Sequence, residues 1–459
     1  MNLKKSIAQV FSANFLQLIT SIIIGFVLPT ILSIEGYANL KTYSLYISYI
    51  GLFHFGFIDG LYIKYGGKEN KSIDKQKLKG EHNFLIVFQL IISIIVLVIG
   101  LLLKNIVLIL FSMSILPIMI QAFHKYFYQA IGDFKRYSRI IYIYTIIYMI
   151  LNLALSLVFK EENYIFYCLT MFGANIISIL VCECKFLLEN RKIKAQIDFE
   201  EIIKITKTGF VILVGNLIVV SLFGIDKWFV KLFLTTEDFA YYSFSYSMLN
   251  IINVLISAIS ITFYNYLFSN NNENSINKLK NNLITLGGAA SCGFFVIAII
   301  VENFIKKYIP SLNIIAITFA VFPYMILINA LYINLYKVNK DEKKYLKIVI
   351  GVFLIAILYN IIAIIFFKNT ISLAVATVLT LITWVIYSTN DLENVKKDNK
   401  QYIYMFLLTI TFLICTILLN ILIGGVVYGI LFIIYTFIFN KEFILDTKKI
   451  IIKLINNKK

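Results

Sequence analysis

Residues 224–246 read GIDKWFVKLFLTTEDFAYYSFSY, and they place one aspartate and two lysines inside an otherwise apolar run. A polar turn, TTED, and an aromatic segment follow. The chain has 459 residues, of which 60% are hydrophobic and 15% charged, and its mean hydropathy is +0.84. This composition indicates a membrane protein, in which charges within a helix should face protein or water rather than lipid.

Runs of about 18 to 25 mostly uncharged residues recur along the whole chain, and each can cross a bilayer as a helix. The first run follows Lys4 and Lys5 and is too long for a signal-peptide core. The runs lack strict alternation, so helices are favoured over a barrel. The predicted fold class is an all-α polytopic membrane protein of about 14 transmembrane helices. The runs fall at 7–32, 38–63, 83–103, 105–131, 140–159, 163–185, 209–234, 239–268, 283–301, 312–336, 346–367, 370–390, 402–420 and 423–440.

Lysine and arginine are unevenly distributed between the loops. If the N-terminus is inside, alternate loops hold 34 of the 42 basic residues. Because basic loops resist translocation, we expect both termini to be cytoplasmic. The net charge of +17 then reflects this sidedness and attraction to anionic membrane lipids, and it gives no reason to expect nucleic acid as a partner.

Motifs for catalysis or metal binding are not apparent in the sequence. The five cysteines fall in predicted membrane segments, and His54, His82 and His124 share no metal-ligand spacing. The longest outer loop, around 302–311, is too short for the outer domain that enzymes acting on lipid-linked sugars usually carry. We therefore expect a transporter rather than an enzyme, with no cofactor and no resident metal.

Two sequence matches indicate an internal repeat. SIEGYANLKTYS at 33–44 aligns with TTEDFAYYSFSY at 235–246, and LPIMI at 116–120 aligns with FPYMI at 322–326. Six predicted helices separate the members of each pair, so the two halves share one orientation, as parallel transporter repeats do. We assign an N-lobe at 1–190, a cytoplasmic linker at 191–208, a C-lobe at 209–390, and a last helix pair with a basic cytoplasmic tail at 391–459.

Four stretches carry a resemblance to a known family. They are NFLQLITSIIIGFVLPTILSIEGYANLKTYSLY at 14–46, GLFHFGFIDGLYIKYGG at 51–67, KYFYQAIGDFKRYS at 125–138 and the opening stretch. In these stretches the chain resembles the polysaccharide flippases of the multidrug/oligosaccharidyl-lipid/polysaccharide (MOP) exporter superfamily. The resemblance implies two six-helix lobes around a polar central cavity, with the last helix pair beside them. It also implies transport of undecaprenyl-diphosphate-linked oligosaccharide units across the bacterial plasma membrane, for which we expect alternating access between the lobes.

Polar residues at helical spacing predict the lining of such a cavity. Isolated asparagines also join membrane helices through hydrogen bonds, so each residue keeps that alternative. Lys125 lies close to a basic loop and is a candidate to receive a diphosphate. The candidate substrate and cavity residues are Asn14, Gln17, Gln121, Lys125, Asp226, Lys227, Asn250, Asn253 and Asn329.

His54, Asp59 and Asp226 are candidates for coupling to H⁺ or Na⁺. A packed His54 and a helix-capping Asp59 are the alternatives for that pair. On one continuous helix, Asp226, Lys227 and Lys231 would fall within an arc of about 140°. Asp226 could equally form an ion pair that joins the lobes, while Lys231 could reach the outer surface along its own stem.

Three other functions remain open at this point. A peptidoglycan-precursor flippase fits the same architecture, although the precursor flippases of the family that the chain resembles carry an arginine early in the eighth helix, where this chain has SFSYS at 243–247. A multidrug-type exporter would usually have twelve helices. A membrane polymerase or transferase is the enzymatic alternative. Besides the lipid-linked substrate, polysaccharide assembly proteins are the expected partners.

Overall fold

The structure is a computed structural model that describes residues 3–269, 272–445 and 448. Each of the fourteen predicted runs is mainly helical, and no strand occurs among the described residues, which confirms the all-α fold class. Eleven helices in these ranges are long and apolar enough to cross a membrane, and a bent pair makes up to twelve. The chain divides into two compact units, Met1–Val220 and Ser221–Lys459.

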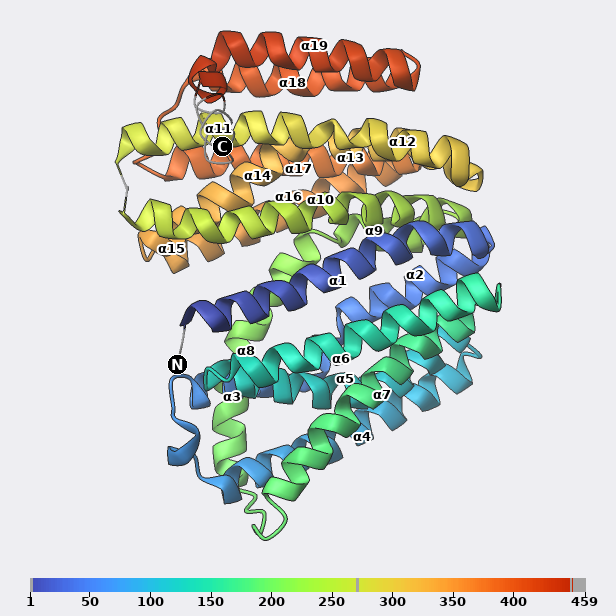
Figure 1. The fold of residues 1–459 in the computed structure, drawn as a ribbon, viewed down its shortest axis with the longest axis vertical. Helices are drawn as coiled ribbons and strands as arrows, with labels where there is room; N and C mark the ends of the chain where they lie inside the picture. Colours follow the sequence, from blue (N-terminus) through green and yellow to red (C-terminus); the bar gives the residue numbers. More distant parts are fainter. Residues whose placement is uncertain (1–2, 270–271, 446–447, 449–459) are drawn as a thin grey trace, which may run out of the picture. The chain divides into compact units, whose positions relative to one another are not determined.

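The first unit is built around one central helix, α5, which contacts α2, α3, α4, α6 and α7. In Figure 1, α1 lies along α6, and these two helices also contact each other. The elements of this unit are α1 (Leu3–Ile31), α2 (Ile34–Ser48), η1 (Ile50–His54), α3 (Phe57–Tyr65), η2 (Asn70–Ser72), α4 (Lys75–Leu102), α5 (Ile106–Ala130), α6 (Phe134–Leu153), η3 (Ala154–Val158), α7 (Tyr164–Glu189) and α8 (Phe199–Leu222).

The second unit has its last two helices paired and docked on α11 (Figure 1). The Tyr428 hydroxyl of α19 donates to the carbonyl of Gly288 over 3.0 Å, and the Asn440 amide donates to Thr285 over 2.9 Å. The elements are α9 (Ile225–Phe233), α10 (Thr236–Ser269), α11 (Glu273–Ser291), α12 (Gly293–Phe304), η4 (Lys306–Ser311), α13 (Leu312–Phe319), α14 (Phe322–Ile326), η5 (Leu327–Tyr332), α15 (Ile333–Val338), α16 (Glu342–Phe366), α17 (Thr370–Asp391), α18 (Asn399–Ile417) and α19 (Ile421–Phe439).

The predicted run 38–63 is not one continuous helix. It breaks between α2 and α3, where Phe55 and Gly56 adopt left-handed φ angles of 49° and 89°. The buried Gln89 amide donates to the carbonyl of Phe53 over 2.9 Å, and the backbone N–H of Gly56 donates to Nδ1 of His54 over 3.1 Å. Side chains therefore replace the backbone partners that the break removes.

The predicted run 209–234 is also broken, so the single helix expected there is wrong. The helix α8 ends at Leu222 and α9 begins at Ile225, with Phe223 and Gly224 between them. The hydroxyl of Tyr246 donates to the freed carbonyl of Phe223. Asp226 thus lies in the first turn of a new helix instead of deep within a long one.

The two turns that the predicted repeat aligns have the same type of helix cap. The hydroxyl of Ser33 accepts the backbone N–H of Gly36 over 3.0 Å at the start of α2. At the matching turn, the hydroxyl of Thr235 accepts the backbone N–H of Asp238 over 3.1 Å at the start of α10. Both caps satisfy an N–H that has no partner within its helix.

Three glycines let α3 and α8 touch through their backbones. A Cβ on Gly209 would lie 1.9 Å from the carbonyl oxygen of Gly56, and one on Gly60 would lie 2.1 Å from that of Ile205. Small residues at membrane helix interfaces allow this approach. Ion pairs strengthen the same contact, because Lys64 of α3 pairs with Glu201 of α8 over 2.6 Å and also with Glu81 of α4.

Replacing Gly209 with alanine is expected to lower the free energy of unfolding by about 1–3 kcal/mol, because the backbone of α3 leaves no room for a methyl group. Gly215→Ala in the same helix is the matched control, since no described atom lies within 4 Å of its Cβ position. Thermal unfolding of the purified protein in detergent measures both. Equal melting temperatures for the two variants would contradict the packing described.

Candidate functional site

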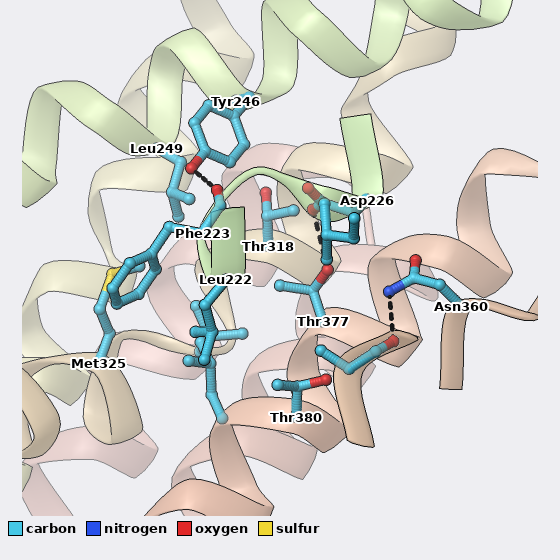
Figure 2. A pocket seen from close by; sticks show the side chains of 14 residues that line it. Leu222, Phe223, Asp226, Tyr246, Leu249, Thr318, Met325, Asn360, Thr377 and Thr380 are labelled. Carbon is cyan, nitrogen blue, oxygen red and sulfur yellow. Dashed lines mark hydrogen bonds between the residues drawn. The ribbon is translucent and has the colours of Figure 1, made fainter. Parts of the chain in front are cut away.

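The carboxylate of Asp226 is buried in the second unit and is held by hydroxyl groups. It is 3% exposed. Its Oδ2 accepts hydrogen bonds from the hydroxyls of Tyr242 on α10, over 2.7 Å, and Thr377 on α17, over 2.9 Å. Its Oδ1 accepts the backbone N–H of Lys227 over 2.8 Å. Figure 2 shows Thr377 beside Asp226.

The ammonium group of Lys227 contacts an aromatic ring instead of forming an ion pair with the neighbouring carboxylate of Asp226. Its Nζ lies over the ring of Tyr246, 3.9 Å from the ring centroid, which is a cation–π contact. Within the described part of the chain, no lysine or arginine comes within 4.0 Å of the Asp226 carboxylate. The three hydrogen-bond donors therefore leave this buried carboxylate without a cation within salt-bridge distance among the described residues, and a bound cation would supply one.

A small pocket opens beside Asp226 and presents further oxygen atoms (Figure 2). Asn360 of α16 lies 1% exposed on its wall, with its amide N–H bound to the carbonyl of Ala356. The side-chain oxygen of Asn360 has no hydrogen-bond donor among the described residues. Thr377 and Thr380 add hydroxyl groups. A carboxylate, an amide oxygen and hydroxyls are the ligands that hard cations such as Na⁺ prefer, so this pocket is a candidate cation site.

The remaining predicted cavity residues have differing exposure. Asn14 and Gln17 on α1 are exposed, and Gln121 on α5 is buried. In the second unit, Asn250 is exposed, whereas Asn253 and Asn329 are half-buried. That these side chains line one shared cavity stays a prediction.

Lys125 is a half-buried cation near the end of α5. Among the residues that the structure describes, none forms a hydrogen bond or ion pair with its ammonium group. The nearby Arg136 differs, because it pairs with Glu189 over 3.0 Å and with Asp133 over 3.3 Å. Lys125 therefore keeps its full hydrogen-bonding capacity for an anionic ligand.

The structure brings His54 and Asp59 together at the break between α2 and α3. Nε2 of His54 lies 3.8 Å from Oδ2 of Asp59, and both side chains are buried. Nδ1 of His54 accepts the N–H of Gly56, so the neutral ring carries its hydrogen on Nε2, which faces Asp59. This pair can hold a proton, but 3.8 Å is too long for a hydrogen bond.

Tyr242, Thr377 and Asn360 are site residues that the sequence analysis missed. Thr377 and Thr380 occur three residues apart on a helix, which is a usable signal for one polar face. That signal does not distinguish them from the many other threonines and tyrosines of the chain.

Comparisons with known proteins identify the fold. No family model matches the chain, and no curated protein matches it. A structure of the lipid II flippase MurJ, in an inward closed conformation, matches with a TM-score of 0.68 and 16% identity, over 95% of this chain and 99% of that one. An inward-facing multidrug resistance MATE transporter of the MOP superfamily matches with a TM-score of 0.56 and 11% identity, over 82% of this chain and 94% of that one.

The chain has the fold of MOP-superfamily transporters. A MATE transporter from Vibrio cholerae agrees, with a TM-score of 0.50 and 12% identity over 87% of this chain and 99% of that one. These proteins are transporters and flippases rather than enzymes. Together with the eleven apolar helices, the shared fold establishes a multi-pass membrane protein.

Removing either hydroxyl donor to Asp226, in Tyr242→Phe or Thr377→Val, is expected to lower the free energy of unfolding by about 1–3 kcal/mol, because each bond serves a buried charged group. Thr380→Val is the control, since the hydroxyl of Thr380 bonds to the carbonyl of Ala376 in its own helix. Thermal unfolding compares the three variants. If Thr380→Val lowered the melting temperature as much as the other two variants, the hydrogen bonds to Asp226 would contribute no more to stability than the bond within the helix.

Proposed function

We propose that this chain is a flippase that moves undecaprenyl-diphosphate-linked oligosaccharide units across the bacterial plasma membrane by alternating access. The main support is the fold match to a flippase over 95% of the chain. The 5% of this chain that the match leaves uncovered is shorter than α18 and α19 together, so the matched part includes at least some of that helix pair. The multidrug-type transporter with a TM-score of 0.56 matches 82% of the chain.

The half-buried Lys125 supports an anionic substrate. Its ammonium has no hydrogen-bonding partner among the described residues, and a diphosphate supplies several charge-assisted acceptors. In the orientation that the basic loops predict, the C-terminal end of α5 faces the cytoplasm, where a lipid-linked substrate is made. We assign to Lys125 the first contact with the diphosphate, and we place both termini on the same cytoplasmic side.

The pocket at Asp226 supports coupling of transport to a cation. A cation or proton entering there would neutralise the carboxylate that α10 and α17 hold through Tyr242 and Thr377. Because Asp226 lies just after the break between α8 and α9, neutralising it would change the balance of forces at that joint. This joint is the proposed link between ion binding and conformational change.

A peptidoglycan-precursor flippase is the second candidate function. The fold match to MurJ supports it directly, since that protein is described as a lipid II flippase. SFSYS at 243–247 supports the oligosaccharide function instead, because no arginine occurs there. Substrate choice in a direct assay distinguishes the two, and a small-molecule export assay tests the multidrug alternative.

In proteoliposomes with fluorescent undecaprenyl-diphosphate oligosaccharide, Lys125→Ala is expected to slow flipping about 10- to 100-fold, which corresponds to one lost charge-assisted contact. Lys135→Ala is the control, since Lys135 is an exposed cation of the same basic region. Transport of lipid II alone would overturn the oligosaccharide assignment in favour of the second candidate. Equal rates for the two variants would remove Lys125 from the binding site.

Wild-type flipping is expected to respond to an imposed Na⁺ or H⁺ gradient, and Asp226→Asn should abolish that response, because it removes the charge and nearly keeps the shape. Asp238→Asn, in the polar turn after α9, is the matched control. Flipping rates are compared with each gradient present or collapsed. A wild-type rate that ignores both gradients would exclude coupling at this site.

A further inference from the structure

Two histidines and one glutamate meet in the first unit, although they lie far apart in the sequence. Oε1 of Glu183 on α7 lies 2.8 Å from Nε2 of His82 on α4 and 2.6 Å from Nε2 of His124 on α5. Both imidazoles are fully buried, whereas the side chain of Glu183 is 15% exposed. Each residue lies within about two turns of a helix end.

The hydrogen bonding leaves both rings with an unused nitrogen. A carboxylate oxygen can only accept, so each Nε2 must carry the hydrogen that it donates to Glu183. The Nδ1 atoms of His82 and His124 are then bare acceptors, and neither has a hydrogen-bond partner among the described residues. Hydrogen bonding to Glu183 thus uses one nitrogen of each ring, and metal binding through Nε2 would leave the other, as Nδ1–H, equally without a partner among the described residues.

The same three groups suit a metal ion. Their ligand atoms lie within 4.8 Å of one another. Two imidazoles with one carboxylate form a ligand set that zinc sites use, with a water in the fourth position. To bind the ion, each ring moves its hydrogen from Nε2 to Nδ1, which frees both Nε2 lone pairs without net loss of a proton from either ring.

Aromatic side chains fix the directions of the two imidazoles. The ring of Phe186 lies 4.7 Å from that of His82 and 5.4 Å from that of His124, and Phe123 lies 5.1 Å from His82. In the described part of the chain, no lysine or arginine comes within 4.0 Å of Glu183. Nothing cationic therefore competes for its carboxylate, and the exposed part of the Glu183 side chain leaves the cluster open to the outside of the protein on one side.

We propose that His82, His124 and Glu183 form a binding site for a divalent transition-metal ion of the zinc class. Metal-ligating histidines usually donate their second N–H to a neighbouring acceptor, and loss of such a partner weakens binding about 10- to 100-fold. The described residues offer no such acceptor, so the ion is exchangeable. Bound metal would tie α4, α5 and α7 together near their ends and restrict their relative movement.

This site is independent of the proposed function. It lies in the first unit and shares no residue with the pocket at Asp226. It needs no transported substrate. An exchangeable metal that restrains three helices would act as a regulator of whatever the chain transports.

The test uses full-length protein purified in detergent through a tag without histidine, because such a tag would itself bind zinc. Equilibrium dialysis with Zn²⁺ should show one ion per chain, and the ion should raise the melting temperature. His82→Gln and Glu183→Gln should each weaken binding at least about tenfold. His54→Gln is the matched control, since His54 is the chain's third histidine and lies outside the cluster; its binding should be unchanged.

Two further measurements guard against other causes. Cys182→Ala/Cys184→Ala should still bind Zn²⁺, and loss of binding there would assign the metal to thiols and overturn the proposal. Co²⁺ added to the wild-type protein should give ligand-field absorption bands without a thiolate charge-transfer band. This Co²⁺ measurement uses only the wild-type protein, so it does not depend on whether the variants fold. Absence of stoichiometric binding by the wild-type protein would also overturn the proposal.

Discussion

The structure depends on one constraint: inside a membrane, every backbone N–H and C=O must find a partner within the protein. An unbroken helix meets this condition by itself, and most of the chain is helix. Two of the predicted spans that break meet it with side chains, from Gln89 and His54 in the run 38–63 and from Tyr246 in the run 209–234. These are also the places where Asp59 and Asp226 lie. Broken helices thus create the polar positions at which buried acids can be held.

Buried charge is handled in several different ways. Asp226 is stabilised by hydroxyl donors, and Lys227 by an aromatic ring. Glu81 and Glu201 share Lys64 in a network that fastens α8 to α3 and α4. Lys125 has no such partner among the described residues. The charges with paired partners stabilise contacts between helices, whereas Asp226 and Lys125 are the two charges for which we propose a ligand.

The two units offer different kinds of ligand chemistry. The second unit presents hard oxygen ligands around Asp226, which suit a monovalent cation or a proton. The first unit presents imidazole nitrogens with a carboxylate, which suit a softer divalent ion. A transporter whose helices must move can use an oxygen-lined cation site, such as that at Asp226, to drive a conformational change. It can use a site with imidazole ligands, such as that at His82 and His124, to restrain the change. The backbones of α3 and α8 pack directly against each other at Gly56 and Gly209, so a movement of one helix would displace the other.

The sequence by itself determined the helical class and the approximate positions of the helices, and it drew attention to Asp226. Hydrophobic run length is a local property, and a lone acid in an apolar run is conspicuous wherever the chain folds. Tertiary structure decided the partners: Thr377 lies 151 residues from Asp226, and Glu183 lies 101 residues from His82. It also decided where helices break, as at Phe223 and Gly224, because a remote hydroxyl, that of Tyr246, must be at hand to donate to the exposed backbone carbonyl. Such contacts depend on how each helix is rotated and crossed against its neighbours, which the periodicity of a single run does not specify.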